Sequence, residues 1–223
     1  VATVEPLDAR AFRASGPLVS VDETAGSYVL DLRPFHHRNA RNGELTVELG
    51  DDTACEIDGA GSTGDDCVTA LAALAEGTPT SARGAYGVAA GRFTATRVLA
   101  GSSVPGADFD TIEGFVAARD LDVLTLQGGT VIREDGEVVY AEGGIEVELG
   151  SGTDVTRDGG SAQPLDIDDI SVGQRIQAFG TATSSDFEPR LNARSVRLLP
   201  TEVTGIVLGA VSGELRLDLA SLA

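Results

Sequence analysis

The feature that most constrains the fold is an internal repeat of about 100 residues. Residues 47–50 (VELG) recur as residues 147–150, 100 positions later, and residues 92–98 (RFTATRV) match residues 190–196 (RLNARSV), 98 positions later. Two further matches keep the same order: residues 16–20 with 114–118, and residues 74–77 with 170–173. Matches in one order with similar offsets predict two copies of a small domain.

Within each copy, apolar and polar residues mostly alternate, as in residues 145–149 (IEVEL), which is typical of strands. The dipeptide at 135–136 (Asp-Gly) predicts a tight hairpin, and the one at 58–59 predicts the end of another strand. The clearest helical pattern is residues 68–74, with residues 165–170 as a shorter counterpart. We therefore predict an all-β fold of two tandem small, OB-like β-barrels, each with about six strands and one short helical turn.

These patterns also predict the domain boundaries. We expect an N-terminal extension at 1–13, repeat 1 at 14–101, a linker at 102–110, repeat 2 at 111–200, and the first hairpin of a third repeat at 201–223. The last segment would carry an uncovered strand edge, which seeks a partner. It either packs on repeat 2, belongs to a further barrel, or completes a barrel in another molecule.

Residues 111–199 carry the motifs VGQRI at 172–176 and ARSVR at 193–197. This stretch resembles the tandem β-barrel repeats of unknown function found in secreted and lipid-anchored bacterial envelope proteins. Repeat 1 resembles them more loosely, because residues 76–79 (EGTP) stand where the second copy has VGQR. The resemblance implies a barrel fold and an envelope or extracellular setting. It implies no activity, since no catalytic residue is recognised for such repeats.

The charge of the chain restricts its partners. It has 35 acidic against 16 basic residues and a formal net charge of −19, and every basic residue is arginine. The absence of lysine excludes Schiff-base chemistry and a phosphate-binding loop of the P-loop type. A strongly negative chain is repelled by nucleic acid and by anionic membrane surfaces, so we expect neither as a partner. Without a long apolar run, we also expect no membrane insertion.

Cys55 and Cys67 are the two cysteines of the chain. Their spacing fits neither a Cys-x-x-Cys redox pair nor a zinc site. We predict a structural disulfide, with two buried free thiols or a reactive pair as the alternatives. A disulfide favours an oxidising compartment, so we expect a secreted, periplasmic or cell-surface protein.

His36 and His37 are the two histidines and the weak candidates for a metal site. Adjacent residues of a strand point to opposite faces, so both could bind one ion only from a turn. Arg33 and Arg38 flank the pair and would repel a cation. We therefore expect an exposed loop pair, with no metal and no cofactor.

Arg33, Arg38 and Arg41 form a basic cluster in an acidic chain. Local pairing with nearby carboxylates at 44, 51 and 52 would make the cluster structural. Otherwise it forms a basic surface that contacts an acidic patch of a neighbouring molecule.

The loop 59–64 (GAGSTG) has the spacing of a dinucleotide-binding loop and resembles a nucleophile turn at Ser62. Asp65 and Asp66 would repel a pyrophosphate at the following helix and are better explained as helix caps. The fold also offers no parallel βαβ unit for a nucleotide and no base for Ser62. We expect neither activity here.

These observations favour a non-enzymatic, extracytoplasmic repeat protein. It would act as a structural, spacer or self-assembly module of the bacterial envelope or extracellular matrix, and its partners would be other copies of itself or further repeats. The alternative is a binding module for a cation, calcium or another metal, or for a small ligand.

Overall fold

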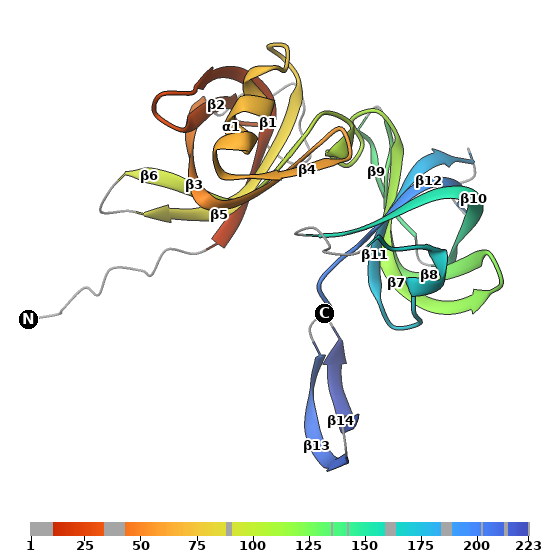
Figure 1. Ribbon diagram of the computed structural model, residues 1–223. Coiled ribbons are helices and arrows are strands. Elements are labelled where there is room, and N and C mark those ends of the chain that lie inside the picture. The colour runs from red at the N-terminus through yellow and green to blue at the C-terminus, as the bar shows by residue number, and fades with distance from the viewer. Residues whose placement is uncertain are drawn as a thin grey trace, which may run out of the picture. The chain divides into compact units, whose positions relative to one another are not determined.

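The computed structural model describes residues 11–33, 43–87, 91–134, 136–141, 143–158, 164–183, 189–201, 203–211 and 214–222 (Figure 1). The chain divides into two compact units. The first runs from Val1 to Asp110 and includes Ile132–Val138, and the second comprises Thr111–Val131 and Val139–Ala223.

The first unit contains a closed barrel. Its strands are β1 (Ala11–Asp22), β2 (Ser27–Asp31), β3 (Glu44–Ile57), β4 (Ala60–Thr63), β5 (Pro79–Gly87) and β6 (Arg92–Ala100). They follow the order β2-β1-β5-β6-β3-β4, and pairing of β2 with β3 closes the ring. Helix α1 (Gly64–Ala72) connects β4 to β5, and a 3₁₀ turn, η1 (Gly101–Ser103), follows β6.

A second barrel repeats this arrangement, and the ends of three of its strands, at Asp110, Ile132 and Val138, fall in the first unit. Its strands are β7 (Asp110–Asp120), β8 (Val123–Ile132), β9 (Val138–Tyr140), β10 (Ile145–Arg157), β11 (Arg175–Ala182) and β12 (Arg190–Leu198). The order is β10-β12-β11-β7-β8-β9, and pairing of β8 with β10 closes the ring. A 3₁₀ turn, η2 (Ile167–Asp169), takes the place of α1.

Both rings have the topology of an OB barrel. Without β4 and β9, each ring has five strands, of which the first three form a meander. The third ring strand pairs in parallel with the fifth (β3 with β6, β10 with β12), and the fourth pairs with the first (β5 with β1, β11 with β7). The prediction of two tandem OB-like barrels is therefore confirmed. The sixth strand of each sheet, β4 or β9, extends the edge and lies outside the closed ring of five.

Helix α1 begins four residues before the predicted pattern. Thr63 occupies the N-cap position without a side-chain capping bond, and Asp65 and Asp66 lie in the first turn. The expectation that these aspartates cap the helix is therefore wrong. Their charge still favours the helix, because carboxylates are stabilising near its positive end.

The two barrels share an internal contact that fixes the bend in their third strand. The parallel register shifts between Leu49 and Ala54, and at this bulge the Thr53 hydroxyl accepts a hydrogen bond from Gly50 N (2.8 Å) and donates one to Ala95 O (2.8 Å). Thr153 makes the equivalent bonds in the second barrel, at 2.8 and 2.9 Å. The repeat thus conserves side-chain contacts as well as topology within this one chain.

In each barrel one glycine, in β5 or in β11, allows the neighbouring strand to pack closely. A Cβ atom on Gly84 would overlap the carbonyl oxygen of Thr94, and one on Gly180 would overlap that of Asn192. Both glycines lie where the register of the last hairpin shifts. Only a residue without a side chain fits at these positions.

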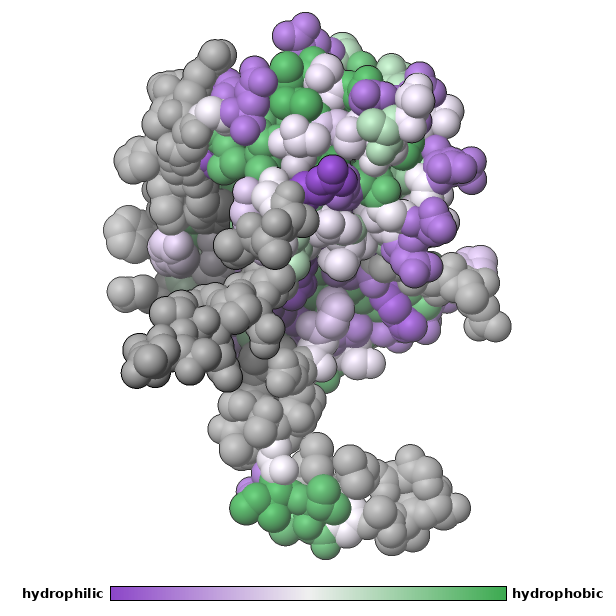
Figure 2. Space-filling view, turned by 90° about the vertical axis from the view of Figure 1, so that its left-hand side faces the viewer, coloured by the Kyte–Doolittle hydropathy of each residue, from purple (hydrophilic) through white to green (hydrophobic). Residues whose placement is uncertain are grey.

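The hairpin of β13 (Val203–Val211) and β14 (Glu214–Leu222) forms a two-stranded sheet of its own. Ile206, Val207 and Leu208 are 69%, 59% and 70% exposed, and they contribute to the green surface in the lower part of Figure 2. Contiguous apolar patches are uncommon on the surfaces of monomeric proteins. Among the helices that the structure describes, none is long and apolar enough to cross a membrane.

Candidate functional site

The predicted disulfide is present. Cys55 of β3 and Cys67 of α1 are bonded, with Cα atoms 5.7 Å apart, and both are buried. The bond ties α1 to the barrel wall and supports an oxidising environment. In the second barrel Val155 takes the place of Cys55, because both residues pair with the equivalent valine of the last strand, Val98 or Val196.

The glycine-rich loop does not form a phosphate cradle. Gly61 and Ser62 lie within β4, and Ser62 pairs with Cys55 across the antiparallel ladder to β3. The Ser62 hydroxyl is buried and has no hydrogen-bond partner among the residues that the structure describes. A hydroxyl enclosed in this way is not presented to a substrate.

Of the basic and histidine cluster, the structure places Arg33 alone. His36, His37, Arg38 and Arg41 lie outside the described residues, so their roles stay predictions. Arg33 forms an ion pair with Asp31, 3.6 Å between Nη2 and Oδ2, which is a local pairing with a different carboxylate from those expected. Within the described part of the chain, no group of three or more His, Cys, Asp or Glu side chains could hold a metal ion.

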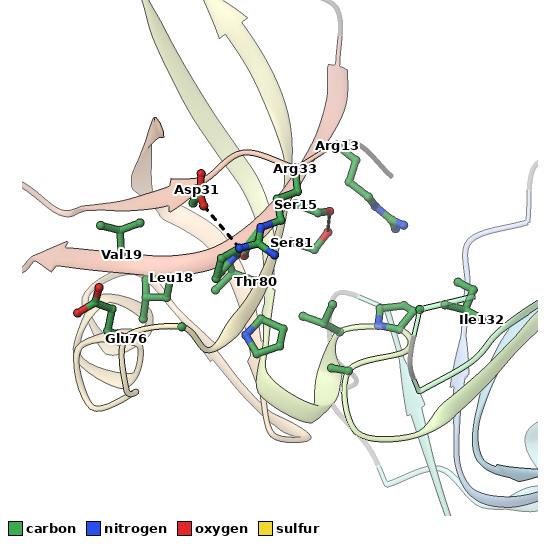
Figure 3. Close-up of a pocket in the computed structure, with 18 of the residues that line it drawn as sticks. Arg13, Ser15, Leu18, Val19, Asp31, Arg33, Glu76, Thr80, Ser81 and Ile132 are labelled. Atoms are coloured by element: carbon green, nitrogen blue, oxygen red, sulfur yellow. Dashed lines mark hydrogen bonds and ion pairs between the residues drawn. The ribbon is translucent and has the colours of Figure 1, made fainter. Parts of the chain in front are cut away.

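A cavity of about 600 Å³ lies in the first unit beside β1 and β5. Figure 3 shows Arg13, Ser15, Arg33 and Ser81 around it, with the Ser15 hydroxyl donating to Ser81 Oγ over 3.1 Å. Apolar residues of the same unit complete the lining: Pro17, Pro79, Val104, Pro105, Ala107, Ile132 and Val138. This combination of apolar walls and a few convergent polar groups is typical of small-ligand sites.

The outer face of the first barrel carries a row of arginines beside this cavity. Arg13 of β1 lies directly opposite Arg83 of β5, and Arg83 lies opposite Arg97 of β6. Directly opposite residues of an antiparallel pair project from the same face. Arg97 forms an ion pair of 2.9 Å with Glu56, whereas Arg13 and Arg83 are both exposed.

Sequence reasoning missed this row. The strands that carry Arg13 and Arg83 are 70 positions apart in the chain, so their juxtaposition depends on which strands close the barrel. The sequence near Arg13 carried little signal of the pairing, because residues 14–21 (ASGPLVSV) do not alternate between apolar and polar residues.

The equivalent face of the second barrel has a different chemistry. Arg175 pairs with Glu113, Gln177 donates from Nε2 to Glu113 Oε2 (2.7 Å), and Arg197 donates from Nη1 to Gln177 Oε1 (2.9 Å). Arg197 also lies over the ring of Phe179, 4.8 Å from its centroid. These polar groups satisfy one another, which is the arrangement of a structural network.

We found no protein-family model and no curated protein that matches the chain. Among solved structures, the chain is similar to the single-stranded DNA binding protein from Thermus aquaticus. The sequence identity is 12% and the TM-score 0.20, and the alignment covers 92% of this chain and 98% of that chain.

This finding corrects the exclusion of nucleic acid as a partner, because the similar protein is named for binding single-stranded DNA. The exclusion rested on the net charge of −19, which is a sum over the whole chain. Binding depends on the local potential of one face, and the arginine row shows that local and net charge differ here. At a TM-score of 0.20 the likeness carries no argument for binding by this chain.

Proposed function

We propose that the chain is a non-enzymatic repeat protein that acts outside the cytoplasm as a structural module and associates with another copy through the β13–β14 hairpin. The observation that carries this proposal is the exposed apolar hairpin, a two-stranded sheet of its own. A two-stranded hairpin is only marginally stable in water, and a third or fourth strand stabilises it.

The two barrels indicate how such a hairpin is completed. In the first barrel, the opening strands β1 and β2 gain β5 and β3 as second neighbours. In the second barrel, β7 and β8 gain β11 and β10. Among the described strands, β13 and β14 pair with each other alone, which leaves an edge on each side. Unpaired edges are templates for pairing with another chain.

The sequence of β14 (ELRLDLASL) is self-complementary when two copies run antiparallel. With Leu217 on the twofold axis, position 216 of each copy lies opposite position 218 of the other. This register sets an arginine against an aspartate twice, and opposite charges directly across a ladder are stabilising. Such an isologous pairing closes as a dimer.

The disulfide supports the compartment. Disulfides persist in oxidising surroundings and are rare in the reducing cytosol. Because the cysteines are buried and joined in the first barrel, we propose a secreted, periplasmic or cell-surface location.

The assembly is tested by sedimentation velocity over micromolar to millimolar concentrations. Val207 lies opposite Leu217 in the hairpin, so Val207→Glu sets a charge beside the proposed axis in both copies. We expect this variant to raise the dissociation constant at least tenfold, about 1.4 kcal/mol. The matched control is Val172→Glu, which makes the same change at a 62% exposed valine of the second barrel and leaves association unchanged. A wild-type chain that stays monomeric throughout this range contradicts the proposal.

A further inference from the structure

Two arginines, Arg13 and Arg83, face each other across β1 and β5, and neither is paired with a carboxylate of the described residues. Both residues are exposed, and their side chains make no ion pair or hydrogen bond with any residue in the part of the chain described here. Like charges directly opposite on a ladder are destabilising. In a chain with more than twice as many acidic as basic residues, an uncompensated arginine pair is unexpected.

The other arginines described in this barrel are all paired. Arg33 pairs with Asp31, Arg92 with Glu48 at 2.8 Å, and Arg97 with Glu56. The barrel therefore supplies carboxylates to its remaining guanidinium groups but leaves Arg13 and Arg83 available. This selectivity distinguishes the pair from ordinary surface arginines.

The neighbouring row of the same face adds hydroxyl groups. Ser15 lies opposite Ser81, two residues along from the arginines on each strand, which is about 7 Å along a strand. The Ser15 hydroxyl donates to Ser81 Oγ, so in this arrangement Ser81 keeps its own hydrogen for another acceptor. Arg33 N donates to Ser15 O at 2.9 Å and holds a further guanidinium near this row.

We propose that Arg13 and Arg83, with the Ser15–Ser81 pair, form a binding site for an oxyanion group, a phosphate or a carboxylate, carried by a small molecule. Two guanidinium groups on one face match the charge of a dianion and offer paired N–H donors to its oxygens. The adjoining cavity of about 600 Å³ is within the range of small-ligand sites and receives the remainder of the molecule against its proline and valine walls.

The cavity is also lined by three carboxylates, of which Asp31 is paired with Arg33 and Glu44 lies opposite Asp31 in the ladder of β2 and β3. Figure 3 shows Glu76 beside Leu18, at the other end of the cavity from Arg13. Leu18 is five residues from Arg13, about 17 Å along β1. This distance exceeds the Debye length of about 8 Å at physiological ionic strength, so Glu76 does not neutralise the arginine pair.

The site is independent of the proposed assembly, because the hairpin belongs to the other unit. The test measures thermal unfolding and calorimetric binding of the full chain with inorganic phosphate or succinate, against sodium chloride at equal ionic strength. We expect phosphate, succinate or both to raise the unfolding temperature of the first barrel beyond the chloride effect. Arg13→Gln and Arg83→Gln should each weaken that binding at least tenfold.

Arg92→Gln is the matched control, since it removes an exposed arginine of the same barrel that already has a carboxylate partner. It should bind the anion as the wild type does. Without added anion, Arg83→Gln should unfold at the same temperature as the wild type or higher, because it removes a like-charge contact; a structural arginine would show a decrease. Equal binding by Arg83→Gln and the wild type, or no effect of either anion beyond that of chloride, overturns the proposal.

Discussion

Removal of the disulfide should destabilise the first barrel and leave the second unchanged. Cys55 and Cys67 are the two cysteines of the chain, so the second barrel has no bond to lose. Replacement of both by alanine avoids placing a polar group in the core, where Cys55 and Cys67 are 2% and 0% exposed. The two barrels thus form an internal comparison within one molecule.

The magnitude follows from the loop that the bond closes. The cysteines are 12 positions apart. On the chain-entropy model, opening a loop of this length raises the entropy of the unfolded chain by roughly 9–10 cal/mol/K, or about 3 kcal/mol of stability at room temperature. For a domain of this size each kcal/mol corresponds to about 4–8 °C, so the first transition should fall by roughly 12–24 °C.

Scanning calorimetry measures both transitions, and hydrogen exchange read by mass spectrometry assigns each to its barrel. The wild-type chain treated with a reductant should behave like the double alanine variant. A fall of less than about 4 °C, which corresponds to about 1 kcal/mol, would refute the entropic reasoning. An equal fall in both barrels would show that they unfold as one unit.

Two further predictions concern the core of the first barrel. Burial raises the pKa of the Tyr28 hydroxyl above its usual range, and the neighbouring Thr80 side chain offsets only part of the effect. Tyr28 therefore ionises more readily in the unfolded than in the folded chain. The contribution of Tyr28 to the free energy of unfolding should stay constant below about pH 10 and decline as the pH rises further. Urea unfolding at a series of pH values on both sides of about pH 10 measures this loss. Tyr28→Phe should lessen the alkaline loss of stability, and an equal loss in the variant and the wild type would contradict the prediction. Gly84→Ala should lower the free energy of unfolding of the first barrel in urea by roughly 1–3 kcal/mol or more, because the added Cβ overlaps the Thr94 carbonyl. Gly50→Ala, where the structure has space for a Cβ, should lower it little. Equally small losses for the two variants would show that the strands move apart without penalty.

The sequence predicted those parts of the fold that depend on local pattern. The Asp58–Gly59 turn is present, with φ of 49° and 83°, because few other residues tolerate that conformation. The disulfide was predictable because the two cysteines are 12 positions apart, at the end of one predicted strand and the start of the predicted helix. The start of α1 was placed too late, since Gly64 and the two aspartates that begin it break the apolar periodicity.

Features that depend on strand pairing could not be predicted in the same way. Gly84 and Gly180 look like ordinary strand glycines in the sequence, and the carbonyls that exclude a side chain belong to the following strand. The Arg13–Arg83 pair joins the first and fourth strands of a barrel, and its register is set only when the ring closes. Net charge was also the wrong basis for excluding a nucleic-acid partner, because it averages over faces that differ in local charge.

The parallel ladder that closes each barrel has a consequence for the order of folding. Val47 pairs with Phe93 and Ala11 with Ala85, so no barrel can close until its last strand has been synthesised. Contacts this distant in the chain make folding slow, and similar neighbouring domains are prone to exchange strands while they wait. The equivalent strand of the next copy follows 98 residues later and presents a related sequence. The disulfide of the first barrel joins its third strand to its helix. If it forms early, it holds this part of the first barrel together before the equivalent strands of the second copy have been synthesised.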